Sequence, residues 1–165
     1  MLVIGIDPGT AITGYGLVED RPDGSLTAVD FGVILTPPEM EMPQRLLELH
    51  RSLRDILLLH QPVSGAVEKL FFQRNVRTAL SVGQARGVVL LALAQVGLVA
   101  AEYTPMEVKQ AVAGYGGADK NQVQQMVRAI LGLEEIPSPD DAADALAIAI
   151  CHLHSAKMRS LMGMP

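Results

Sequence analysis

The first ten residues constrain the fold more than any other stretch of the chain. Residues 2–6 read Leu-Val-Ile-Gly-Ile, an apolar and largely β-branched run that predicts a buried strand. Pro8-Gly9 cannot continue the strand, so Asp7 comes at its end. A carboxylate there is held by a central strand and still reaches solvent, which suits a catalytic or metal-binding group. Asp-Pro-Gly is also good turn chemistry, so a plain turn stays open at Asp7.

Composition predicts a compact protein. With 165 residues, 49% of them hydrophobic, the chain is long enough for one globular domain, expected over residues 1–154, with a flexible tail at 155–165. The single Cys151 excludes an internal disulfide and a cysteine-based zinc site. No stretch approaches the roughly 18 apolar residues of a membrane span, and a basic flank typical of a signal peptide is missing. We therefore expect a cytoplasmic protein without membrane contact.

Charge is distributed unevenly along the chain. Residues 1–68 carry 4 basic and 10 acidic side chains, whereas residues 69–128 carry 7 basic and 3 acidic ones. The net charge of -5 therefore does not exclude a polyanionic partner, because the middle third offers a basic face. Clustered acids at both ends and bases between them are the pattern expected if acids bind metal and bases bind phosphate.

The hydrophobic pattern predicts an α/β protein. Three antiparallel strands open the chain, and helices then alternate with shorter strands. The expected strands lie at 2–6, 13–19, 26–35, 64–68 and 99–103, and the expected helices at 43–60, 76–97, 106–112, 122–131 and 141–154.

Glu68 ends the fourth expected strand. If that strand runs parallel to the first, Glu68 lies beside Asp7. A single Glu at the start of an exposed loop is the plainer interpretation, so this argument depends on sheet geometry.

Two further acids stand at the start of the last helix. Asp141 and Asp144 are three residues apart, so their side chains share one helix face. Capping and the helix dipole explain Asp140 and Asp141 well, but they do not explain Asp144, which is followed by apolar residues. Asp140 lies four before Asp144, so spacing alone does not choose between 140 and 141.

These acids supply oxygen donors, and no group of His or Cys residues lies beside them. Oxygen donors favour hard cations such as Mg²⁺ or Mn²⁺ over zinc. Two such ions would clamp a phosphate for in-line attack.

Several short motifs occur in order from residue 1 to about residue 154: Gly5–Thr10, Val67–Phe71, Leu80–Gly87, Val108–Gln110, Lys120–Val123 and Asp141–Ala147. Together they resemble the RuvC family of Holliday-junction resolvases in the ribonuclease H-like superfamily. The resemblance implies a five-stranded mixed sheet flanked by helices, a homodimer, and a metal-dependent endonuclease that nicks two symmetric strands of four-way junction DNA in recombination and repair. It also implies association with a branch-migration complex of the RuvA and RuvB type.

Position by position, the resemblance implies four catalytic, metal-binding acids: Asp7, Glu68, Asp141 and Asp144. It favours Asp141 over Asp140. The family match and the basic middle third together place Lys109 and Lys120 near the scissile phosphate.

The segment after Glu68 is an expected DNA contact. Phe71 and Phe72 are two of only three Phe in the chain, which has no Trp, and Arg74 and Arg77 follow them. Aromatic rings beside basic residues suit stacking on an unpaired base, and Phe71 occupies the family's aromatic position. The alternative is that both rings close the core.

Two other functions are compatible with the sequence. A phosphate-binding domain of the actin and sugar-kinase class has a first phosphate loop similar to Gly5–Thr10 but needs a second domain, for which 165 residues leave little room. A structure-specific DNA-binding module would carry the same acids without a catalytic role.

Overall fold

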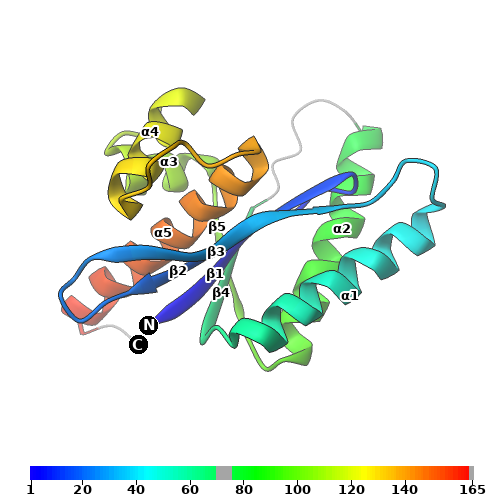
Figure 1. Ribbon diagram of the computed structural model, residues 1–165, viewed down its shortest axis with the longest axis horizontal. Helices are drawn as coiled ribbons and strands as arrows, with labels where there is room; N and C mark the ends of the chain where they lie inside the picture. Colours follow the sequence, from blue (N-terminus) through cyan, green and yellow to red (C-terminus); the bar gives the residue numbers. More distant parts are fainter. Residues whose placement is uncertain (70–75, 164–165) are drawn as a thin grey trace.

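A five-stranded sheet forms the centre of the protein and helices cover both of its faces (Figure 1). The computed structural model describes residues 1–69 and 76–163, without the side chains of residues 76 and 77. The expected DNA contacts Phe71, Phe72 and Arg74, and the side chain of Arg77, lie outside the described residues. The elements are β1 (Leu2–Asp7), β2 (Ile12–Asp20), β3 (Leu26–Leu35), α1 (Met42–His60), β4 (Ser64–Glu68), α2 (Val76–Gln95), β5 (Ala100–Tyr103), α3 (Pro105–Ala113), α4 (Lys120–Leu131) and α5 (Asp140–Leu161).

The strand order β3-β2-β1-β4-β5 places β1 in the middle of the sheet. β1 pairs antiparallel with β2, and β2 pairs antiparallel with β3. β4 runs parallel to β1, and β5 runs parallel to β4. The predicted fold class is therefore confirmed, and the continuous apolar character of residues 2–6 follows from burial of β1 on both faces.

The two faces of the sheet carry separate cores. Ile4 and Ile6 pack with Leu53 of α1 and Leu93 of α2, whereas Val3 packs with residues of α3, α4 and α5. Figure 1 shows this division, with α1 and α2 on one side and α3, α4 and α5 on the other. Along residues 1–69 and 76–163, no helix has both the length and the apolar character that crossing a bilayer requires.

Helix α4 begins two residues before its predicted start. Asp119 accepts a hydrogen bond from the backbone N–H of Gln122, and the Gln122 side chain accepts one from the backbone N–H of Asp119. This reciprocal capping box fixes the start of a helix. It makes Lys120 the first helical residue rather than part of the preceding loop.

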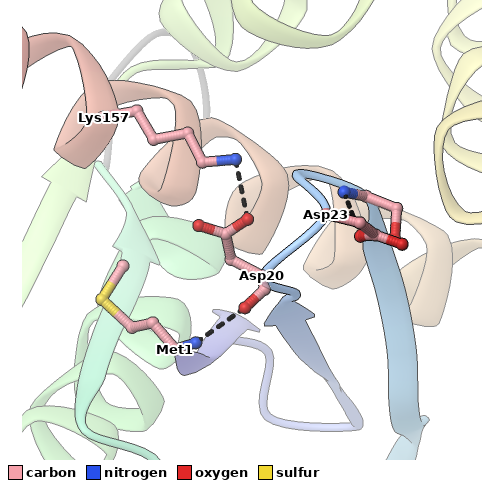
Figure 2. A network of polar contacts seen from close by, with 5 residues as sticks. Met1, Asp20, Asp23 and Lys157 are labelled. Carbon is pink, nitrogen blue, oxygen red and sulfur yellow. Dashed lines mark hydrogen bonds and ion pairs between the residues drawn. The ribbon is translucent and has the colours of Figure 1, made fainter.

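Helix α5 runs to Leu161, beyond the predicted end at His154, so residues 155–161 of the tail expected at 155–165 are helical. Lys157 forms an ion pair of 2.7 Å with Asp20 at the end of β2, and the backbone carbonyl of Asp20 accepts a hydrogen bond of 2.8 Å from the amino group of Met1 (Figure 2). The end of α5 is thus tied to the sheet by a contact between residues far apart in the chain.

His152 connects α5 with two strands and is 4% exposed. Its Nε2 lies 2.6 Å from Ser64 Oγ, and its Nδ1 lies 2.9 Å from the Tyr103 hydroxyl. The imidazole therefore holds the helix to the sheet.

Candidate active site

Asp7 and Glu68 end two neighbouring parallel strands. The register pairs Ile6 with Val67, so the next residue of each strand is one of the two acids. Because side chains alternate along a strand, and Ile6 and Val67 pack on the α1 and α2 side, both carboxylates point to the α5 side. The predicted juxtaposition of Asp7 and Glu68 is present.

Glycines let α5 approach these strands closely. A Cβ at Gly5 would overlap the carbonyl oxygen of Ala145, and one at Gly14 would overlap the carbonyl oxygen of Asp141. Gly5 lies on β1 and Gly14 lies opposite Asp7 on β2. The backbone of α5 therefore rests on the sheet where β1 ends, which brings the start of the helix over Asp7.

The four acids act on one another electrostatically. The pKa of Asp7 is raised from 3.8 to about 7, mainly by burial and then by the charges of Glu68, Asp144 and Asp141, in that order of strength. The pKa of Glu68 is also raised, first by burial and then by the charge of Asp144. The structure thus brings together the four predicted carboxylates, drawn from β1, β4 and the first turns of α5.

Two lysines lie beside this group. Glu68, Asp144, Lys109 and Lys120 line one open pocket of about 240 Å³. Lys120 Nζ lies 3.4 Å from Asp144 Oδ2. Burial raises the pKa of Asp144, and the Lys120 ammonium opposes that rise. The pocket therefore joins acids that suit a cation with bases that suit a phosphate.

Asp140 occupies a different place from Asp141. Its carboxylate contacts Lys120 Nζ at 3.1 Å, and it is not among the charges that raise the pKa of Asp7, whereas Asp141 is. The electrostatics thus separate two residues that spacing alone left as alternatives.

The donor set fits a hard divalent cation. The four side chains offer only carboxylate oxygens, and their mutual repulsion is relieved by a cation between them. Within residues 1–69 and 76–163, no three Asp, Glu, His or Cys side chains already converge as the ligands of one ion. The acids are therefore close enough to repel one another, but their oxygens are not already arranged as the ligands of one metal ion.

Thr13 is a further residue that supports the site and that the sequence did not single out. Its hydroxyl donates to the Gly9 carbonyl at 2.6 Å and accepts from the Gly9 N–H at 3.2 Å, and the residue is 1% exposed. Both polar groups of Gly9 are thereby paired, which holds the loop that follows Asp7.

Protein without metal is expected to lose stability as the pH rises from about 4 to about 7. In this interval folded Asp7, with a pKa near 7 against its usual 3.8, binds more protons than unfolded Asp7, so ionisation favours unfolding. Asp7→Asn removes this contribution and should raise the melting temperature near neutral pH by about 5 °C. Thermal unfolding in EDTA across this pH range measures both proteins. If the melting temperatures of wild type and Asp7→Asn change in parallel with pH, the expectation is wrong.

Comparison with known proteins assigns the family. A family model described as "Crossover junction endodeoxyribonuclease RuvC" matches residues 3–152. The protein of that name from Desulfitobacterium hafniense (strain DSM 10664 / DCB-2) is 61% identical over 163 residues, covering 99% of this chain and 98% of the relative.

Solved structures agree with this assignment. RuvC of T. thermophilus in complex with Holliday junction substrate has a TM-score of 0.88 at 39% identity, over 96% of both chains. The yeast mitochondrial Holliday junction resolvase Ydc2 shares the fold, with a TM-score of 0.69 at 17% identity, over 96% of this chain and 82% of that one. The fold is ribonuclease H-like, and the chain belongs to the RuvC family of crossover junction endodeoxyribonucleases.

Proposed function

We propose that the protein is a structure-specific endodeoxyribonuclease that resolves four-way (Holliday) junctions by nicking two symmetric strands, in homologous recombination and DNA repair. The observation that carries this proposal is the arrangement of the acids. Asp7 and Glu68 end adjacent parallel strands and face Asp144 of α5. This arrangement lies in a chain 61% identical to a crossover junction endodeoxyribonuclease.

The acids and lysines would divide the chemistry between them. Asp7, Glu68, Asp141 and Asp144 would hold two divalent ions, Mg²⁺ or Mn²⁺. When bound, such ions activate a water and stabilise the charge that develops on the scissile phosphate. Lys109 and Lys120, which line the same pocket as Glu68 and Asp144, would bind this phosphate and neutralise it.

Nicking of a synthetic four-way junction separates this function from that of a binding module. The purified protein should nick an end-labelled junction with Mg²⁺ and should bind it without nicking in EDTA. A linear duplex of the same sequence is the control substrate. A protein that binds the junction tightly but never nicks it with Mg²⁺ or Mn²⁺ is a binding module.

Lys109→Ala should flatten the salt dependence of junction binding. Each phosphate neutralised by a lysine adds about 0.9 to the slope of log K against log salt. We expect the slope to fall by about one and the nicking rate to fall about 10-fold or more. Lys157→Ala, which loses an ion pair with Asp20 instead, is the matched control. If both Lys109→Ala and Lys120→Ala leave the salt slope of binding and the nicking rate unchanged, these lysines are solvated helix residues without a role in DNA binding.

A homodimer is the assembly that suits a substrate with two equivalent strands. The solvent face of α2 supports this proposal, because Leu80 and Leu91 are 66% and 54% exposed. Between them a Cβ at Gly87 would meet open space. A second copy could pack its own α2 against this stripe.

Leu91→Glu should therefore yield a monomer at micromolar concentration in sedimentation velocity, because a charge would be buried at the contact. Single nicks should persist while paired nicks disappear. Met158→Glu, at a residue of α5 that is 54% exposed, should leave the dimer intact. If the Leu91→Glu protein remains dimeric, the dimer contact does not involve this face of α2.

The remaining features of the proposal rest on the family. Phe71, Phe72, Arg74 and Arg77 are proposed DNA contacts in which Phe71 stacks on an unpaired base. A branch-migration complex of the RuvA and RuvB type is the proposed partner, and the cytoplasm is the proposed location. Residues 1–154 are proposed to form a single nuclease domain.

A further inference from the structure

The ammonium group of Lys120 lies between two carboxylates of α5. Its Nζ is 3.1 Å from Asp140 Oδ2 and 3.4 Å from Asp144 Oδ2. One turn further along α4, Gln124 Nε2 donates to Asp140 Oδ1 at 3.0 Å. Helix α4 therefore contacts both carboxylate oxygens of Asp140, through Lys120 and Gln124, whereas its contact with Asp144 is made by Lys120.

The two carboxylates have different surroundings. The Asp144 side chain is 37% exposed and that of Asp140 is 64% exposed. Asp144 lines the pocket with Glu68, whereas Asp140 does not line it and acts on the acidic group through its charge, which raises the pKa of Asp144. Asp140 thus holds the lysine from the outer edge of the acidic group.

This placement becomes important when a divalent cation binds Asp144. The cation takes the carboxylate that Lys120 contacts and repels the ammonium at the same time. A lysine held by Asp144 alone would either compete with the cation or turn away into solvent. Asp140 and Gln124 offer it a second anchorage that leaves Asp144 available.

We propose that Asp140 is a positioning residue, which keeps the Lys120 ammonium at the edge of the acidic site while Asp144 binds a divalent cation. This inference rests on the proposed function for its place in catalysis. The contact between Asp140 and Lys120 is itself a property of the protein without DNA. An exposed ion pair contributes little to stability, so Asp140 acts on the position of a charge and not on the fold.

Asp140→Asn is therefore expected to weaken Mn²⁺ binding and to slow nicking, each by about 10-fold, the size of effect seen when the partner of a metal-site residue is removed. The melting temperature should stay unchanged. Asp140→Glu, which keeps the carboxylate, should recover most of both losses. Calorimetric titration with Mn²⁺ without DNA measures the first quantity, and single-turnover nicking at saturating Mn²⁺ measures the second.

Asp55→Asn controls for the loss of one negative charge, because Asp55 lies on α1 with a side chain that is 72% exposed. A double-mutant cycle with Lys120→Met separates an action through the lysine from direct attraction of the cation. If Asp140 acts through Lys120, Asp140→Asn should change Mn²⁺ affinity less than about threefold in the Lys120→Met protein.

Equal effects of Asp140→Asn with and without Lys120 would overturn the inference, as would behaviour identical to that of Asp55→Asn. Failure of the proposed function is a separate result. If the wild-type protein binds Mn²⁺ and never nicks a junction, the nuclease assignment fails, and the cycle in Mn²⁺ affinity still decides the role of Asp140.

Discussion

Asp7→Asn is expected to lower the rate of junction nicking by about a thousandfold or more. Asp7 stands at the end of the central strand, where its carboxylate interacts with Glu68, Asp144 and Asp141. Asparagine keeps the shape of the side chain but removes the charge that would capture a cation. The fold should survive, because no cavity opens and repulsion between the acids falls.

Junction binding separates loss of chemistry from loss of substrate. The Asp7→Asn protein should bind the junction at least as tightly as wild type, since it repels phosphate less. Asp55→Asn, which removes an exposed acid of α1, should nick at the wild-type rate. An Asp7→Asn protein that nicks within threefold of wild type with Mg²⁺ would remove Asp7 from the catalytic group.

Gly5→Ala is expected to have the largest effect on stability. The added methyl group would overlap the Ala145 carbonyl and the backbone nitrogen of Ala149. Backbone atoms of a packed helix cannot move aside as a flexible side chain can. Overpacking of this kind costs about 3 kcal/mol and should lower the melting temperature by roughly 10 °C.

The same substitution should affect the site. A shift of α5 away from β1 carries Asp141 and Asp144 with it, so nicking at 25 °C should fall even where the protein remains folded. Gly83→Ala is the control, because a Cβ there meets no heavy atom within 4 Å and alanine favours the helix by about 1 kcal/mol. Equal melting temperatures for the two variants would show that α5 does not rest on Gly5.

Local patterns predict the sheet and the acids well. The apolar run before Asp7 and the short strand before Glu68 indicate both strands. Helix α1 connects β3 to β4, and such a crossover favours parallel strands, but the register that sets Asp7 beside Glu68 is seen only in the structure. Asp144 stands out because neither capping nor the helix dipole explains it. The strands and Asp144 depend on neighbours in the sequence, so local patterns indicate them, whereas the place of Glu68 depends on the sheet.

Tertiary contacts account for what the patterns miss. The extension of α5 to Leu161 is accompanied by the ion pair of Lys157 with Asp20, a residue of β2 that no local pattern connects to it. The need for Gly5 arises only where helix and strand meet. The early start of α4 is the exception, since the spacing of Asp119 and Gln122 is a recognisable capping box.

Resolution of a cruciform extruded from a supercoiled plasmid tests the central claim most directly. Two acidic sites that nick symmetric strands within one binding event convert the plasmid to linear product, whereas uncoordinated nicks leave an open circle. With Mg²⁺ the wild-type protein should give linear product. The wild-type protein in EDTA and the Asp7→Asn protein with Mg²⁺ should give neither linear product nor open circle. Linear product from Asp7→Asn at the wild-type rate, or no cleavage by wild type with either Mg²⁺ or Mn²⁺, would contradict the account.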